Sequence, residues 1–203
     1  FDIIKISSFD CASHKMIEEI SNSKFKEIIV STGCTYDHEI KKTSDLLSKK
    51  EFTLMHCISI YPTPMNEVHL ERIDHLRKFS KNVGLSEHSN SDRDGLKISI
   101  ASLMYDVKYI ERHFTILPKE KTKDGIVSLN PSELKKLSEI SKKPKNFIKE
   151  YISENIREFE NMKGLKEREL SQDELLNRDY YRGRFASKDN KGEVIYNWED
   201  KPL

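Results

Sequence analysis

Two histidines in this sequence follow short apolar runs, and each has a carboxylate close by. His88 comes directly after Glu87, and His113 stands two positions after Glu111. Imidazole is a good ligand for borderline divalent metals, with carboxylate or water completing the shell. A lone histidine is more often a hydrogen-bonded structural residue. Two histidines at neighbouring strand ends leave both readings open, a structural role and a shared metal site.

A lysine lies inside an apolar run at the start of the sequence. Lys5 is flanked by isoleucines, so a strand would place its side chain on one face of a sheet. An interior lysine pairs with a carboxylate, forms a Schiff base or holds an anion, whereas a lysine at a strand edge extends into solvent. Glu111 is costly to bury without a task or a partner. It is therefore either a catalytic carboxylate or one half of a structural ion pair with a lysine such as Lys5.

Serine recurs at the ends of successive apolar runs. Hydroxyls and backbone N–H groups at such ends bind phosphate oxygens well, although a single serine there is more often a turn residue. Together with Lys5 they indicate an anion site. These serines are Ser8, Ser31, Ser59 and Ser86.

These side chains must be positioned by alternating strands and helices. Five apolar runs are spaced at about the length of one strand–helix unit, and the segments between them have helical periodicity. Uninterrupted alternation of this kind predicts parallel strands. The runs are Ile3–Ser7, Glu27–Ser31, Phe52–Cys57, Val83–Ser86 and Tyr109–Phe114.

Such units build either an open doubly wound sheet or a closed eight-stranded barrel. All five runs end in polar, reactive side chains, which favours the barrel, because there every strand end faces one shared site. The sequence contains no G-x-G-x-x-G or G-x-x-x-x-G-K motif of nucleotide-binding sheets. We therefore predict an α/β fold in which residues 1–143 form a partial (β/α)8 TIM barrel, strands four to eight. Three further units are expected before Phe1.

The sequence after the barrel changes character. Residues 144–180 are predicted to form a helical extension and a linker, because the segment is strongly charged and 165–180 has few large apolar side chains. Residues 181–203 are predicted to begin a small second domain, with a strand and a turn around Lys191 and Gly192.

Composition excludes several classes of protein. Lys and Arg number 35 and Asp and Glu 34, so the net charge of +1 is too small to attract nucleic acid or an anionic membrane. Hydrophobic residues make up 36% and occur in compact runs, which argues against disorder. No apolar stretch is long enough for a membrane span, and residues 1–10 do not resemble a signal peptide. The three cysteines are expected to be reduced, and the protein to be cytoplasmic.

The order of several segments resembles the sialic acid synthase family, whose members make N-acetylneuraminate and related nonulosonic acids. The Tyr-Pro-Thr-Pro and Glu-x-His-Phe-Thr runs are diagnostic together. The resemblance extends from residue 2 to about 140 and returns at 185–193. The segments are Lys5–Ser8, Ile29–Gly33, His56–Pro64, Gly84–His88, Glu111–Thr115, Asp124 and Ser128–Pro131.

This resemblance implies an enzyme with a TIM barrel, an appended small antifreeze-like (SAF) domain beginning in 181–203, and a homodimer in the full-length protein. The implied reaction condenses phosphoenolpyruvate with an open-chain N-acetylated hexosamine. The implied cofactor is a divalent metal, with manganese expected and magnesium or cobalt as alternatives. The resemblance places the metal on His88 and His113, and phosphoenolpyruvate on Lys5, Ser8, Ser31, Ser59 and Ser86. It places Glu111, Asp124 and Tyr61 against the reacting groups and the sugar.

Two alternatives stay open beside this interpretation. One is another phosphoenolpyruvate-condensing barrel, which would lack the Tyr-Pro-Thr-Pro segment. The other is an inactive fragment, since five strands cannot close a barrel, and we expect the 203-residue chain alone to be inactive. Ser59, Glu87 and the 121–123 run Lys-Thr-Lys depart from the usual family residues near the sugar, which leaves open an acceptor related to the standard hexosamine.

Overall fold

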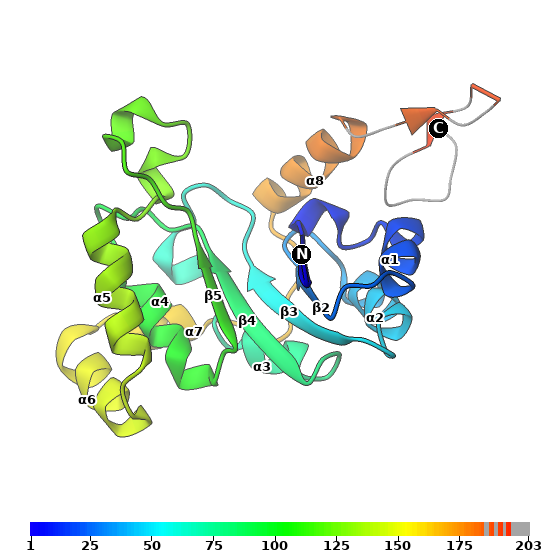
Figure 1. Ribbon diagram of the computed structural model, residues 1–203. Coiled ribbons are helices and arrows are strands. Elements are labelled where there is room, and N and C mark those ends of the chain that lie inside the picture. The colour runs from blue at the N-terminus through cyan, green and yellow to red at the C-terminus, as the bar shows by residue number, and fades with distance from the viewer. Residues whose placement is uncertain (185–186, 189–190, 193, 196–203) are drawn as a thin grey trace.

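Five parallel strands form the centre of the protein. The structure, a computed structural model, describes residues 1–184, 187–188, 191–192 and 194–195. The strands pair in chain order, so β1 and β5 are the outer two, as the spacing of the apolar runs predicts (Figure 1). They are β1 (Ile3–Ile6), β2 (Glu27–Ser31), β3 (Glu51–Cys57), β4 (Asn82–Glu87) and β5 (Tyr109–Arg112).

The sheet is strongly curled. In a flat sheet, four spacings of about 4.8 Å would hold β1 and β5 about 19 Å apart. Instead, the Lys5 ammonium on β1 lies 3.3 Å from the Glu111 carboxylate on β5. At the opposite end of the strands, Lys108 lies 2.8 Å from Glu27 on β2 and 2.7 Å from Glu51 on β3. Contacts across the concave face at both ends define a half-barrel, which confirms the predicted partial barrel architecture.

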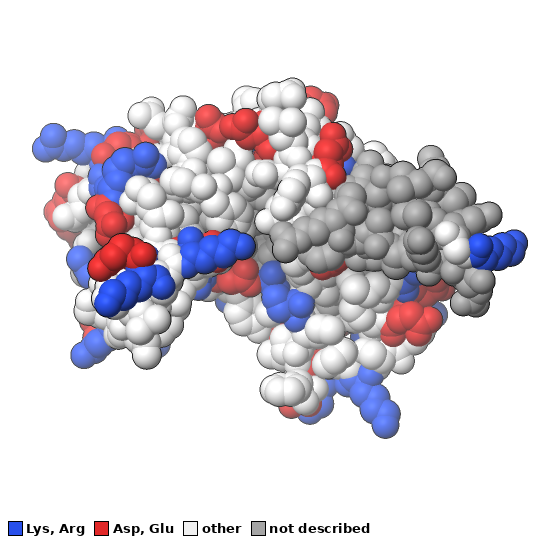
Figure 2. All heavy atoms as spheres, turned by 90° about the horizontal axis from the view of Figure 1, so that it is seen from above, with Lys and Arg blue, Asp and Glu red and all other residues white. Residues whose placement is uncertain are grey.

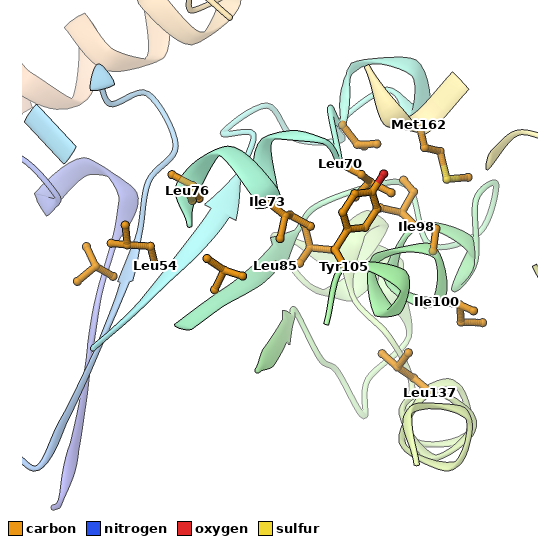
Figure 3. Packing of buried hydrophobic residues seen from close by; sticks show 14 of the residues in the cluster. Leu54, Leu70, Ile73, Leu76, Leu85, Ile98, Ile100, Tyr105, Leu137 and Met162 are labelled. Atoms are coloured by element: carbon orange, nitrogen blue, oxygen red, sulfur yellow. The ribbon is translucent and has the colours of Figure 1, made fainter. Parts of the chain in front are cut away.

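Helices cover the convex face of the sheet. They are α1 (His14–Ser21), α2 (Asp37–Leu46), α3 (Arg72–Leu76) and α4 (Lys97–Ser102), one after each of the first four strands. Alternate strand residues such as Leu54 and Leu85 point toward these helices and pack with Ile73, Leu76 and Ile98 (Figure 3). This apolar layer holds the strands in register, and it leaves their polar carboxyl ends free to converge.

Two further helices follow the barrel portion and pack beside α4. They are α5 (Pro131–Ser141) and α6 (Lys145–Asn155). Asn130 caps α5, because its side-chain oxygen accepts from the amides of Ser132 and Glu133 at 2.9 and 3.0 Å. Glu133 completes a capping box by accepting from the Asn130 amide at 2.8 Å. A short helix, α7 (Phe159–Lys163), comes next.

The predicted linker at 165–180 is wrong in its second half, which is the start of α8 (Gln172–Arg184). Ser171 opens the helix by accepting from the Glu174 amide at 3.3 Å, and Glu174 accepts from the Ser171 amide at 3.0 Å. Several of the polar side chains that suggested a linker, among them Asn177 and Arg178, bond to the rest of the protein. Glu174 is fully buried in an ion pair with Arg168, and Arg178 is 7% exposed. This segment has few apolar side chains because buried ion pairs hold it against the protein, and it is not a solvent-exposed linker.

The predicted start of a small SAF-like domain at 181–203 falls largely outside the described residues. Within the described part, β6 (Ser187–Lys188) and β7 (Val194–Ile195) form an antiparallel pair. On the face seen from above, acidic and basic side chains of the described residues are interspersed, in keeping with the balanced composition (Figure 2). None of the helices described has the length and apolar character that a membrane crossing requires.

Candidate active site at the carboxyl ends of the strands

Polar side chains from four strands form one hydrogen-bonded chain on the concave face. Lys5 donates to the Ser31 hydroxyl at 2.8 Å and pairs with Glu111 at 3.3 Å. Ser86 donates to the other Glu111 oxygen at 2.8 Å. The Lys5 and Glu111 side chains are 31% and 41% exposed, so both charges face an open surface. The ion pair that the sequence left open is therefore present, and its two members remain accessible to a ligand.

The other two predicted serines lie around Gly33 instead of in this chain. Ser8 accepts a hydrogen bond from the Gly33 amide at 3.1 Å. A Cβ at Gly33 would clash with the Ser59 hydroxyl and come within 2.9 Å of the Ser8 hydroxyl, so a larger residue there would displace both serine side chains. Cys57 lies 3.7 Å from the Ser59 hydroxyl, and burial raises the pKa of its thiol. The five predicted anion-site residues thus form two adjacent groups joined near Cys57.

His88, His113, Tyr61 and Asp124 come together beside these groups. The two imidazoles meet edge to face with their ring centroids 5.2 Å apart. Tyr61 packs against His88 with centroids 4.2 Å apart, and its hydroxyl lies 3.0 Å from His88 Nε2. Asp124 Oδ2 lies 3.7 Å from His113 Nδ1. The structure therefore brings together four of the five residues that the resemblance assigned to the metal, the reacting groups and the sugar; the fifth, Glu111, belongs to the hydrogen-bonded chain described above.

Glu87 is not part of this cluster, although the sequence places it next to His88. Successive strand side chains point to opposite faces, and Glu87 points into the helix layer, where it pairs with Arg112. Arg112 lies on the helix side of its strand, as alternation along that strand predicts. Glu111 is therefore the carboxylate that shares the inner face with the histidines.

Burial keeps the two imidazoles neutral. It lowers the pKa of His88 to about 4, and burial together with the nearby His88 lowers the pKa of His113. Burial also raises the pKa of Tyr61, so its hydroxyl keeps its proton. A metal-binding histidine must be deprotonated, and both rings meet this condition at neutral pH.

This donor set fits two positions of a divalent metal's shell. Metal–nitrogen bonds are about 2 Å long, so rings with centroids 5.2 Å apart are close enough to share one ion when a nitrogen of each is turned toward it. Asp124 is the nearest carboxylate on the His113 side. Within the part of the chain that the structure describes, no cluster of three or more His, Cys, Asp and Glu side chains has the geometry of a metal site. The remaining ligands would be water or substrate oxygens.

A cleft of about 360 Å³ opens beside His113, and α8 forms one of its walls. In α8, Asn177 donates to the Ser59 carbonyl at 2.8 Å, and the Tyr181 ring stacks on Phe9 with centroids 3.9 Å apart. Figure 1 shows α8 above the carboxyl ends of the first strands. The cleft is lined by Phe9, Ser59, Tyr61, His113, Lys123, Asp124, Asn177 and Tyr181.

Arg178 anchors α8 to the loop after β2. Its guanidinium donates to the Cys34 carbonyl at 2.7 Å, pairs with Glu39 at 2.6 Å, and lies over the Tyr36 ring at 4.7 Å from its centroid. Sequence reasoning missed Phe9, Asn177 and Tyr181 as site residues. Asn177 and Tyr181 lie one helical turn apart, so the sequence could indicate that they share a helix face. It could not indicate which strand end that face contacts.

Comparisons with known proteins identify the family. Residues 1–152 match the model of the NeuB family. The chain is 35% identical over 141 residues to the N,N'-diacetyllegionaminic acid synthase of Campylobacter jejuni. The matched region covers 66% of this chain and 41% of that protein. The chain is 28% identical over 196 residues to a pseudaminic acid synthase of the same species, covering 94% of this chain and 51% of that protein. The chain thus spans about half the length of these relatives.

Solved structures agree with the sequence relatives. The N-acetylneuraminic acid synthetase of Leptospira borgpetersenii, solved with citrate, matches with a TM-score of 0.65 at 25% identity, covering 88% of this chain and 57% of that one. The spore coat polysaccharide biosynthesis protein SpsE of Bacillus subtilis matches with a TM-score of 0.70 at 20% identity, covering 92% of this chain and 50% of that one. This match supports the fold. With three quarters of its residues matched by the family model, the chain belongs to the NeuB family of nonulosonic acid synthases.

Proposed function

We propose that this chain supplies part of an active site that condenses phosphoenolpyruvate with an open-chain N-acyl hexosamine. The products are a nine-carbon keto sugar acid and inorganic phosphate. The observation that carries the proposal is the accessible Lys5–Glu111 pair together with the His88 and His113 rings, which meet edge to face. This arrangement supports a role for Lys5 in holding an anionic substrate, for Glu111 as the reacting carboxylate, and for the two neutral imidazoles as metal ligands.

Lys5 and the strand-end serines are proposed to hold phosphoenolpyruvate. An ammonium beside hydroxyls and backbone amides suits phosphate and carboxylate oxygens. Ser31 already accepts from Lys5, and Ser8 and Ser59 flank the Gly33 amide. Ser86 donates to Glu111 and so connects this anion site to the carboxylate. Lys5 is thus an anion holder and forms no Schiff base.

Glu111 is proposed to act where positive charge develops. The enol carbon of phosphoenolpyruvate forms a bond to the aldehyde carbon, and the aldehyde oxygen becomes the new hydroxyl. Water then adds to the phosphate-bearing carbon, which carries cationic character at that stage. A carboxylate on the inner face orients this water, takes its proton and stabilises the cation. Loss of phosphate from the tetrahedral carbon leaves the ketone.

The acceptor sugar is proposed to occupy the cleft between Asp124 and α8. Tyr61, Phe9 and Tyr181 offer aromatic surface, while Asp124 and Asn177 offer hydrogen bonds. A divalent metal on His88 and His113, manganese in this proposal and magnesium or cobalt as alternatives, would polarise the aldehyde oxygen as a Lewis acid. A cytoplasmic homodimer with a complete SAF domain is also part of the proposal, and it rests on the resemblance.

The proposal is tested by phosphate release from the complete natural protein. Release is expected only when phosphoenolpyruvate, an N-acyl hexosamine and the divalent metal are all present. Glu111→Gln should abolish it, because an amide neither takes the proton from water nor neutralises the cation. Lys108→Met, which alters the ion cluster at the opposite end of the strands, is the matched control. Release that does not depend on the sugar would refute the proposed reaction.

A further inference from the structure

A buried ion pair lies directly behind the two histidines, on the opposite face of the same strands. Glu87 on β4 and Arg112 on β5 are register partners, and each immediately precedes one of the histidines. Their side chains pair with each other, and each is only 2% exposed. Because side chains alternate along a strand, the pair faces the helices while His88 and His113 face the mouth of the half-barrel.

Both charges make further hydrogen bonds to different elements. Glu87 accepts from the Ser89 amide at 2.7 Å and from the Ser99 hydroxyl on α4 at 2.8 Å. Arg112 donates to the same Ser99 hydroxyl at 2.9 Å and to the Val127 carbonyl at 3.4 Å. One buried pair therefore connects β4, β5, α4 and the loop that follows β5.

One of these hydrogen bonds holds the residue that follows His88, and another holds a loop segment that pairs with the His113 backbone. Ser89 follows His88 in the chain, so the carboxylate fixes the residue at which β4 turns away. Val127 lies two residues before Leu129, whose amide donates to the His113 carbonyl at 2.8 Å. The guanidinium thus holds the segment that extends the end of β5. Both strand ends are fixed by a single pair of charges.

We infer that Glu87 and Arg112 are positioning residues that hold His88 and His113 at the separation a shared divalent metal requires. This inference rests on the proposed function. An apolar pair could fill the same volume and avoid the cost of burying two charges. It could not bind the Ser89 amide or the Val127 carbonyl, and those are the contacts that reach the two histidine-bearing ends. The pair therefore supplies orientation that packing alone does not.

The test uses four variants of the complete natural protein. Glu87→Gln removes the charge and keeps the shape, and Glu87→Asp keeps the carboxylate. The double variant Glu87→Met/Arg112→Met removes both charges together, so it leaves no buried charge unpaired and keeps the fold testable. Lys108→Met breaks an ion cluster at the other end of β5 and is the matched control. Thermal unfolding establishes which variants are folded.

Two measurements are made on the folded variants. Mn²⁺ titration by calorimetry should show affinity weakened about 10- to 100-fold in Glu87→Gln and in the double variant, the usual effect of losing a partner outside the metal shell. Glu87→Asp should lie closer to wild type, and Lys108→Met should be unchanged. Without metal, modification of His88 by diethyl pyrocarbonate should be slow in wild type, where the residue is 4% exposed, and several-fold faster in the two weakened variants.

The outcomes separate this inference from the proposed function. Wild-type protein that binds no Mn²⁺ would refute the metal assignment, while faster His88 modification in Glu87→Gln would still support positioning by the pair. Folded Glu87→Gln and double variants with wild-type Mn²⁺ affinity and wild-type His88 reactivity would overturn the inference. The pair would then contribute stability only.

Discussion

Replacing Lys5 by methionine removes the cation at the candidate anion site and leaves a side chain of similar length. The Lys5 ammonium lies 2.8 Å from the Ser31 hydroxyl and 3.3 Å from Glu111. We expect Lys5→Met to raise the KM for phosphoenolpyruvate far more than the KM for the sugar, because only the former carries the phosphate and carboxylate that an ammonium would bind.

The magnitude follows from the exposure of the pair. Two unit charges 3.3 Å apart attract by about 5 kcal/mol at an effective dielectric of about 20, and by about 1.3 kcal/mol in water. Since both side chains are about a third exposed or more, the aqueous value is the relevant one, and the lost pair should cost about 1 kcal/mol of stability or less. A charge-assisted hydrogen bond to substrate is worth about 1.5–3 kcal/mol. The KM for phosphoenolpyruvate should therefore rise about 10- to 150-fold.

The assay is phosphate release by the complete natural protein, with each substrate varied in turn at saturating levels of the other. Lys5→Arg keeps the charge and should retain most of the affinity for phosphoenolpyruvate. Lys108→Met removes a cation from the other end of the strands and should leave both KM values unchanged. An equal rise in both KM values for Lys5→Met would refute the anion site and assign Lys5 to structure.

Three further predictions concern other residues of the fold. His113→Ala should weaken Mn²⁺ binding measured by calorimetry, since one of two imidazole ligands is lost, and unchanged binding would contradict the assignment. Asn177→Ala should raise the KM for the sugar more than the KM for phosphoenolpyruvate, because Asn177 lines the cleft and touches the proposed anion site through the Ser59 carbonyl; the opposite pattern would remove α8 from the acceptor site. Burial lowers the pKa of His56 to about 3 from an ordinary value of 6.5, so the unfolded state binds this proton more readily. The stability contributed by neutral His56 is present above pH 6.5 and is lost as the pH falls, by up to about 5 kcal/mol near pH 3. His56→Gln should flatten this acid dependence in denaturant unfolding, and an unchanged slope would show that other groups cause it.

The strand ends could be predicted from the sequence because the signal is local. Apolar runs that end in polar residues mark the carboxyl ends of parallel strands, and these ends meet at one side of any such sheet. This reasoning placed Lys5, Glu111, His88 and His113 together. It could not establish that Lys5 and Glu111 touch, because that contact depends on the curl of the sheet, which no local pattern encodes.

The contribution of α8 could not be predicted for a different reason. Its polar composition is typical of a linker, and its stability comes from partners far away in the chain. Arg178 pairs with Glu39, which is 139 positions earlier. The partner of Glu87 could not be predicted from the sequence either. Alternation predicts that Arg112 points to the helices, but the matching orientation of Glu87 makes it a partner of Arg112 and not a ligand beside His88.

The fate of the bridging oxygen of phosphoenolpyruvate shows whether water adds to the phosphate-bearing carbon. The complete natural protein is given phosphoenolpyruvate labelled with ¹⁸O at the oxygen between carbon and phosphorus, together with an N-acyl hexosamine and Mn²⁺. If water adds to the phosphate-bearing carbon beside Glu111, the carbon–oxygen bond breaks. Mass spectrometry should then find the label in inorganic phosphate and a nine-carbon keto acid without it. Label retained in the organic product, or phosphate formed with no nine-carbon acid, would contradict the proposed addition of water and cleavage of the carbon–oxygen bond.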